Sequence, residues 1–498
     1  MSQSYDLLVG TFNTPQLYTL RFTPPTSPST SDSTSTSTST SLASSQESIL
    51  SPSTSTSNGS LEIIHRAAAI GSHSWLHLTP RKANGTRNLY ATAWTEPPSV
   101  VAYAVKSATE IELLGRAATQ SRSGYVTANH VAVYSAGGAT GEVFSINRDT
   151  GAFMPPPKTG DKDHRPDGSG SKSLSSSSIE PRPLQTLSFV DSSAQRDDGS
   201  VMDFGGLRHG AHSADLSPSG RALYIADIGR NCIWTYSVSP VDGSLTLGEK
   251  HISPRPNDGP RHVWPHPTGD HVYCVQEHTS IVDVFSTTGK ANSNSDNDDG
   301  VHLTHRQAVR IIPPEEDEHD FWADEVRTSL SSSSQPQYLY ASTRGLKPDK
   351  KGYVAVYKLA PDGTIDENDD EGTRTRTTTT TTTTTRTSSS PVSRSSPVDT
   401  RSESNLSDRD TNVSAGEEND LKASYNGLLC MYETPTSGGW ANAIQPGPTV
   451  GGVEYLVLTD SEEGWVFILG WDGAARKMRE VARTKLDDGA GAATAVWL

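Results

Sequence analysis

The sequence has few cysteines and no long apolar segment. Its 498 residues include three cysteines, Cys232, Cys274 and Cys430, which are odd in number, far apart and without metal-ligand spacing. Such cysteines are typical of free thiols in a reducing compartment, so neither a disulfide framework nor a metal site is expected. No apolar run approaches the roughly 18 residues of a transmembrane helix, and the N-terminus lacks the basic and apolar regions of a secretory signal. These absences predict a cytoplasmic protein with no membrane partner.

Apolar residues and positive charge are also scarce. Hydrophobic residues make up 33% of the chain, and the formal net charge is −16. A negative balance argues against nucleic acid as a partner, although it leaves room for a local positive pocket that binds an anion. The sequence does not decide between a monomer and a homo-oligomer.

Four stretches rich in Ser and Thr account for much of the missing apolar content. They span roughly residues 27–60, 158–200, 287–300 and 362–421, and they lack the side chains needed to offset their ordering entropy. Without them about 350 residues remain, enough for one large core or one closed repeat architecture. We therefore expect one domain over residues 1–498, interrupted by these insertions.

What the sequence does contain is many short β-type runs, mostly of about 5–8 residues, bounded by Gly, Pro, Asn and Ser. Helical periodicity is almost absent, which favours an all-β fold. Residues 210–256 give the clearest unit, with four strands separated by turns. These strands are predicted at His212–Leu216, Ala222–Asp227, Cys232–Val238 and Leu245–Ile252.

The same unit recurs along the chain. Pro218 and Pro267 are 49 residues apart, and so are Tyr224 and Tyr273. Further copies show strands at Gln337–Thr343 and Glu454–Asp460. A four-stranded repeat of about 50 residues indicates a propeller blade, and about 350 core residues then give about seven blades.

A propeller ring must also close, because each blade buries its faces against its neighbours. The chain starts with a run typical of the second strand of a blade, Asp6–Thr11, and ends with the apolar run Ala495–Leu498. We expect the C-terminal strand to complete the first blade as its innermost strand.

Strand geometry also predicts a site. The start of the first strand and the end of the second strand of a blade lie at the same edge, so residues at these positions should gather at one end of the channel. Five polar residues occupy such positions: His212, Asp227, Arg261, Glu277 and Arg344. Arginine offers a planar fork for carboxylates, and His or Glu can transfer a proton. A histidine beside a turn, or an Arg–Glu pair at a strand edge, is also common as a purely structural feature, so the residues alone leave both readings open.

Several stretches resemble a known family. Ala211–Asp227 and Pro260–Glu277 resemble the lactonase family of seven-bladed propellers, which includes bacterial 6-phosphogluconolactonases and fungal 3-carboxy-cis,cis-muconate cyclases. Three others, Glu433–Ile444, Leu458–Trp465 and Val9–Pro15, look like the cyclase group.

This resemblance implies a reaction and a site. The reaction is the cyclisation of 3-carboxy-cis,cis-muconate to 3-carboxymuconolactone by an intramolecular lyase, in the β-ketoadipate pathway of aromatic catabolism, without a metal or redox cofactor. Arg261 and Arg344 would bind the substrate carboxylates, His212 would donate the proton and Glu277 would orient it. His209 offers a competing register for the histidine, and either His212 or Glu277 could be the donor.

Two other functions stay open. A hydrolase of a sugar lactone, such as 6-phosphogluconolactone, would use the same four positions. A non-catalytic propeller scaffold would instead use its Ser/Thr-rich loops as phosphorylated docking segments.

Overall fold

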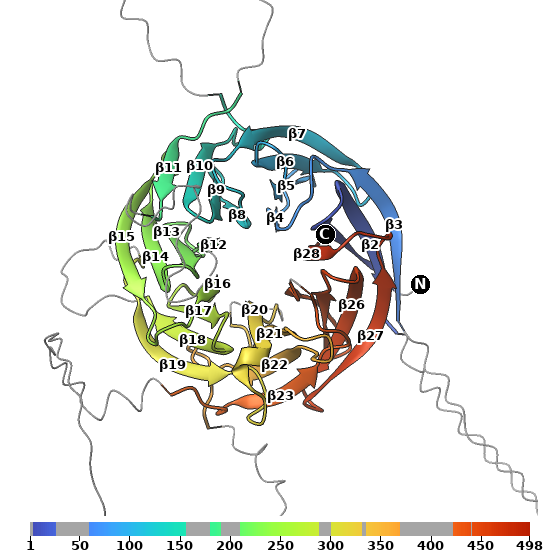
Figure 1. The fold of residues 1–498 in the computed structure, drawn as a ribbon. Coiled ribbons are helices and arrows are strands. Elements are labelled where there is room, and N and C mark those ends of the chain that lie inside the picture. Colours follow the sequence, from blue (N-terminus) through green and yellow to red (C-terminus); the bar gives the residue numbers. More distant parts are fainter. Residues whose placement is uncertain are drawn as a thin grey trace, which may run out of the picture.

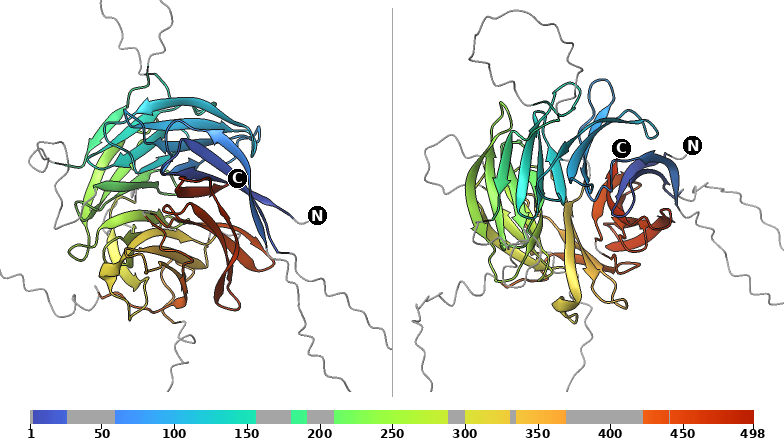
Figure 2. Two further views of the ribbon diagram at one scale, coloured as in Figure 1. Left: turned by 45° about the vertical axis from the view of Figure 1, so that its right-hand side comes forward. Right: turned by 45° about the horizontal axis from the view of Figure 1, so that its top comes forward.

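The computed structural model describes residues 3–25, 59–155, 180–190, 210–287, 300–330, 335–368, 422–439 and 441–498. These residues form seven four-stranded antiparallel sheets around a central channel (Figure 1). Figure 2 shows from two tilted directions how the sheets follow one another around the ring. The predicted seven-bladed propeller is therefore confirmed.

The first three blades come from the N-terminal part of the chain and from its last strand; strands are given from the channel outwards. Blade 1 consists of β28 (Ala492–Trp497), β1 (Tyr5–Thr11), β2 (Gln16–Thr23) and β3 (Ser60–Ala68). Blade 2 consists of β4 (Leu76–Leu78), β5 (Arg87–Ala93), β6 (Ser99–Val105) and β7 (Ile111–Ala118). Blade 3 consists of β8 (Tyr125–Ala128), β9 (Ala132–Gly137), β10 (Thr140–Ser145) and β11 (Gln185–Ser188).

The other four blades follow in chain order. Blade 4 consists of β12 (Ala211–Leu216), β13 (Ala222–Asp227), β14 (Cys232–Val238) and β15 (Leu245–Ile252). Blade 5 consists of β16 (Pro260–Pro265), β17 (His271–Gln276), β18 (Ile281–Ser286) and β19 (Thr304–Arg310). Blade 6 consists of β20 (Phe321–Thr328), β21 (Tyr338–Gly345), β22 (Tyr353–Lys358) and β23 (Leu428–Glu433). Blade 7 consists of β24 (Ile444–Val450), β25 (Val453–Thr459), β26 (Trp465–Asp472) and β27 (Lys477–Lys485).

The ring closes in blade 1, as predicted. The last strand, β28, pairs antiparallel with β1, where Leu8 lies opposite Val496. Neighbouring innermost strands are in contact all around the channel, including β24 with β28 and β28 with β4. Two strands from opposite ends of the chain therefore hold the ring shut.

Burial follows the position of each strand in its blade. All six residues of β13 are buried, whereas the outermost strand β15 exposes most of its residues. The middle strands are covered on both faces because neighbouring blades pack there: Tyr224 of β13, for example, belongs to one apolar cluster with Val263 of β16 and Val272 of β17. This packing fixes the innermost strands, and they carry the site.

The sequence-based limits of the insertions need two corrections. Gln185–Ser188, inside the predicted stretch 158–200, forms the outer strand of blade 3, and Ile365, inside the stretch 362–421, is buried in the core. Most of the four predicted stretches lies outside the described residues. Within those residues the sole helical element is the 3-10 turn η2 (Glu318–Asp320), and no helix is long and apolar enough to cross a membrane.

Candidate functional site

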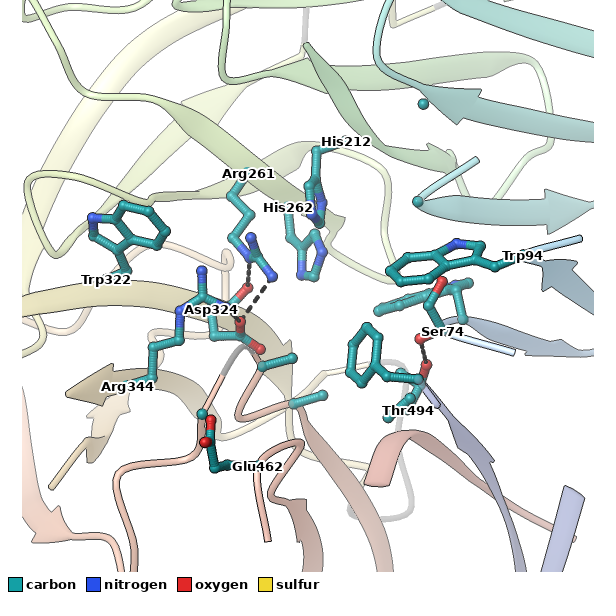
Figure 3. Close-up of a pocket in the computed structure, with 18 of the residues that line it drawn as sticks. Ser74, Trp94, His212, Arg261, His262, Trp322, Asp324, Arg344, Glu462 and Thr494 are labelled. Atoms are coloured by element: carbon teal, nitrogen blue, oxygen red, sulfur yellow. Dashed lines mark hydrogen bonds and ion pairs between the residues drawn. The ribbon is translucent and has the colours of Figure 1, made fainter. Parts of the chain in front are cut away.

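One end of the channel holds a cavity of about 1060 Å³, and every blade contributes to its wall. Figure 3 shows its inner surface, with Arg261, Arg344 and Trp322 on one side and Trp94 on the other. The wall combines charged side chains with aromatic rings, an arrangement suited to a small anionic ligand.

Three polar residues of the wall occupy equivalent positions in three successive blades. The pairing of each innermost strand with its neighbour shifts by one residue at His212 in β12, at Arg261 in β16 and at Asp324 in β20. Each of the three is thus the extra residue of a β-bulge. Bulges re-aim side chains near strand ends, and all three residues line the cavity. Their common position reflects the repeat, although 112 residues separate the first from the last.

Two arginines and two carboxylates form a buried cluster on one side of the cavity. The Arg261 guanidinium lies 2.5 Å from Glu277 Oε2 and 2.9 Å from Asp324 Oδ1. The Arg344 guanidinium lies 3.3 Å from Asp324 Oδ1 and 3.9 Å from Glu277 Oε2. Asp324 Oδ2 also accepts a hydrogen bond from the backbone N–H of Asn442 in the next blade, at 3.1 Å. Asp324 and Glu277 therefore hold the two guanidiniums next to each other.

Burial and neighbouring charges affect the two arginines differently. Burial lowers the pKa of Arg344, and the nearby charge of Arg261 lowers it further, while the two carboxylates oppose both effects. Burial also acts against the charge of Arg261, but Asp324 and Glu277 outweigh it and the pKa is raised. Both guanidiniums stay charged at neutral pH because the pKa of arginine lies so high. Arg344 also lies 5.0 Å from the ring of Trp322.

A second group of buried polar side chains lies beside this cluster. His262 Nδ1 is 3.0 Å from Glu325 Oε1, which in turn is 3.1 Å from the Arg327 guanidinium. Arg327 reaches the Tyr125 hydroxyl at 3.5 Å, and that hydroxyl donates to Asp215 Oδ1 at 2.8 Å. These residues come from blades 3 to 6 and join the innermost strands across the channel.

Burial shifts the pKa values in this second group. It raises the pKa of Glu325 to about 8 and that of Asp215 to about 7, although Arg327 opposes both shifts. It lowers the pKa of His262 well below its usual range, and the neighbouring charge of Arg261 acts in the same direction. Burial therefore favours the neutral form of the His262 imidazole.

The structure brings together most of the residues predicted from strand geometry. His212, Arg261 and Arg344 line the cavity. Glu277 is fully buried behind Arg261 and is not one of the lining residues. His209, the competing register for the histidine, lies outside the described residues.

Asp227 lies at the same end of the channel, because its backbone pairs with Ala211 of the cavity wall, but its side chain forms hydrogen bonds within its own blade. Its carboxylate accepts hydrogen bonds from the backbone N–H of Arg230 at 3.0 Å and from Trp234 Nε1 at 3.0 Å. Asp227 therefore holds the turn that follows β13, and it does not line the cavity. A strand end at the right edge does not by itself place a side chain in the channel, because the side chain can turn back onto its own blade.

Sequence reasoning missed Asp324 and His262 as site residues. It identified the second strand of blade 6 but not the first, although a strand ending at Arg344 requires a partner upstream. Trp322 lies directly opposite Arg344 in that partner strand, and Asp324 follows two residues later. A search for the missing partner strand could have found Asp324. His262 could also have been found, because it directly follows Arg261 at the start of a strand.

Comparisons with known proteins agree with this architecture. A model of the lactonase family, described as a 7-bladed β-propeller, matches residues 190–382. Muconate cycloisomerase 1 of Cutaneotrichosporon cutaneum is 32% identical over 502 residues, covering 99% of this chain and 98% of that protein. Carboxy-cis,cis-muconate cyclase of Neurospora crassa is 24% identical over 298 residues, covering 58% of this chain and 60% of that protein.

Solved structures show the same fold. The periplasmic gluconolactonase of Pseudomonas aeruginosa superposes with a TM-score of 0.59 at 12% identity, covering 100% of this chain and 99% of that chain. At this level of identity the likeness concerns the fold alone.

Proposed function

Because the chain belongs to the lactonase family of seven-bladed β-propellers, we propose that it is an enzyme that cyclises 3-carboxy-cis,cis-muconate to 3-carboxymuconolactone. The observation that carries this proposal is the pair of guanidiniums of Arg261 and Arg344 on one wall of the cavity, both contacting Asp324. Two relatives are named for cyclising muconates, and a muconate is a small polycarboxylate.

The arginine pair suits the charge changes of such a reaction. One substrate carboxylate attacks a carbon of the diene, and negative charge develops on another carboxylate, which becomes enolate-like. A guanidinium fork binds a carboxylate through two parallel hydrogen bonds and stabilises the developing charge. Holding the attacking carboxylate against the diene contributes further, because an oriented intramolecular step avoids the entropy cost of an encounter.

We assign the proton in this reaction to a side chain on the same wall. The sequence assigned this role to His212, which lies there beside His262, with ring centroids 5.0 Å apart. Glu277, predicted to orient His212, forms ion pairs with both Arg261 and Arg344. We therefore assign to Glu277 the holding of the arginine pair.

A spectroscopic assay tests the proposal. Cyclisation breaks the conjugation of the diene, so purified protein mixed with 3-carboxy-cis,cis-muconate should abolish its ultraviolet absorbance. Arg261→Gln should lose this activity, whereas Arg66→Gln should keep it, because Arg66 forms an exposed ion pair with Asp487 on the outer surface. Full activity in Arg261→Gln, or none in the wild type, would contradict the proposal.

The main alternative substrate is cis,cis-muconate, which lacks the third carboxylate. It is favoured by the name of the relative that matches nearly the whole chain. Parallel assays with cis,cis-muconate and with 6-phosphogluconolactone separate the candidates by their ratio of kcat/KM values. Turnover of the sugar lactone alone would support a hydrolase, and no turnover of any of the three would favour a scaffold.

A further inference from the structure

His262 is a buried histidine that the arginine-based mechanism does not use. Its side chain is 3% exposed, and it lines the cavity between Arg261 and the aromatic side of the wall. The ring packs edge-on against Trp75, with centroids 5.1 Å apart, and lies 5.5 Å from the ring of Tyr125. Figure 3 shows it directed into the space below His212.

The two ring nitrogens of His262 face different surroundings. Nδ1 lies 3.0 Å from Glu325 Oε1, within ion-pair distance, and Nε2 has no hydrogen-bond partner among the described residues. Glu325 is fully buried, and its Oε2 likewise lacks a partner within the described part of the chain. A buried polar atom without a partner is costly, and a ligand in the adjacent cavity that supplied a partner for Nε2 would relieve this cost.

We propose that His262, with Glu325 behind it, delivers the proton to carbon when the lactone ring closes. His212 lies beside His262 on the wall but is not the proton donor. This inference rests on the proposed function, since it names a residue for the same reaction. His262 is assigned as the catalytic residue, because it lines the cavity in which the substrate would bind. Glu325 is a positioning residue that holds the proton when no substrate is bound.

The proton balance of the step is simple. A substrate carboxylate forms a new C–O bond, the adjacent double bond shifts its electrons towards the second carboxylate, and the proton on Nε2 forms the new C–H bond. One carboxylate becomes an ester, so the substrate loses one negative charge and one proton is consumed. The His262–Glu325 pair regains that proton from solvent before the next turnover.

The charges around His262 explain why the proton would stay on the His262–Glu325 pair until the substrate binds. The charged and titratable groups that face it from the packed elements are Arg261, Asp324, Glu325, Arg327, Glu277, His212 and Tyr125. Two arginines and burial disfavour the imidazolium, and burial disfavours the ionised carboxylate of Glu325. A bound polycarboxylate adds negative charge at Nε2 and shifts the shared proton towards the histidine, where it is needed.

Kinetics distinguish this role from that of His212. We expect His262→Gln to lower kcat by about 10²- to 10⁴-fold, the usual range for a lost general acid, with KM changed little because the arginine pair is intact. Glu325→Gln should lower kcat and move the alkaline limb of its pH profile to lower pH, and Glu325→Asp should restore part of both. His212→Gln should retain more kcat than His262→Gln. The control is His266→Gln, because His266 contacts Thr268 in a turn at the far end of β16 and does not line the cavity.

Ligand binding gives a readout that does not depend on turnover. Tricarballylate, a saturated tricarboxylate that cannot cyclise, can be titrated calorimetrically in two buffers of different ionisation enthalpy. Wild-type protein at about pH 9 should take up about one proton per bound ligand, because the pair is then deprotonated before binding. Glu325→Gln should take up markedly less.

The outcomes separate the two proposals. If the wild type turns over no muconate, the proposed function fails, and the proton uptake still tests the pair. If the wild type is active and His262→Gln keeps more than a tenth of kcat with an unchanged pH profile, only the inference about His262 fails. If His262→Gln does not fold, as judged by circular dichroism, the Glu325 variants and the proton uptake decide.

Discussion

The Arg261 guanidinium and the Asp324 carboxylate form an ion pair of 2.9 Å that joins blade 5 to blade 6. Both side chains are nearly inaccessible, at 8% and 1% exposure. The same contact therefore serves as a junction between two blades and as part of the cavity wall. Changes made here should affect both stability and ligand binding.

The first prediction concerns the stability of this junction. Asp324→Asn should lower the free energy of unfolding by about 3–5 kcal/mol, because removing one partner leaves two buried guanidiniums short of negative charge. The matched control is Asp487→Asn, which breaks an exposed ion pair with Arg66 and should cost less than about 1 kcal/mol. Denaturant unfolding of both variants measures the difference, and equal losses would contradict this account.

A second prediction concerns the planar shape of the Arg344 guanidinium. Arg344→Lys keeps the charge but loses the planar fork and the contact with the Trp322 ring. If Arg344 binds a substrate carboxylate, the kcat/KM of Arg344→Lys should be about 10- to 150-fold below that of the wild type. This factor corresponds to a lost charge-assisted hydrogen bond of about 1.5–3 kcal/mol. Arg66→Lys on the outer surface should leave kcat/KM unchanged. An unaltered kcat/KM in Arg344→Lys would exclude Arg344 from carboxylate binding.

A third prediction concerns pH and stability. Burial raises the pKa of Asp215 to about 7, against the opposing effects of Arg327 and the Tyr125 hydroxyl. Because this pKa is above that of the unfolded chain, the folded state binds more protons between about pH 4 and 7. The stabilising contribution of Asp215 is thus fully present at low pH and is lost as the pH rises through about 7.

Replacing Asp215 by Asn removes the titration but keeps an oxygen that can accept from Tyr125. The decline in melting temperature between about pH 5 and pH 8 should therefore be smaller in Asp215→Asn than in the wild type. Exposed Asp242, whose pKa is lowered by a hydrogen bond from Ser239, offers the comparison, since Asp242→Asn should not reduce this decline. Identical pH profiles for Asp215→Asn and the wild type would contradict the prediction.

A fourth prediction concerns the glycine two residues before His212. A Cβ on Gly210 would lie 2.2 Å from the carbonyl oxygen of Gly138, and the backbone of Gly138 forms two hydrogen bonds of 2.9 Å with Ala211. Gly210→Ala should displace this contact between blades 3 and 4, and with it His212. Turnover and stability should both fall. In Gly220→Ala the Cβ would meet no atom within 4 Å at a φ of +67°, so only stability should fall, by about 1–2 kcal/mol.

The sequence predicted the blades well where strands and turns alternate locally. The limits of β13, β14 and β15 agree with their predicted ranges, because turn residues bound each of these strands. The limits of the insertions were less accurate: Gln185–Ser188 forms an outer strand that needs few apolar residues, so it resembles its Ser-rich surroundings.

The site was predictable only in part, because half of it depends on contacts between blades. Arg261 and Arg344 could be placed from strand geometry, which is a property of each blade alone. Strand β20 was not recognised, since Asp324, Glu325 and Arg327 interrupt its apolar pattern. These charges are tolerated because their partners come from other strands and other blades. No local pattern reveals such pairing.

The closure of the ring by β28 determines when a binding site can exist. Thr494 of β28 lines the cavity, and its hydroxyl donates to the backbone oxygen of Ser74 in blade 2 at 2.6 Å. Since β28 leaves the ribosome after the other six blades and after the rest of its own, the cavity wall is finished last. A growing or truncated chain would therefore expose the open flank of blade 1 and hold the arginine pair in an incomplete pocket. We therefore expect the proposed substrate to bind only to chains that extend through the closing strand.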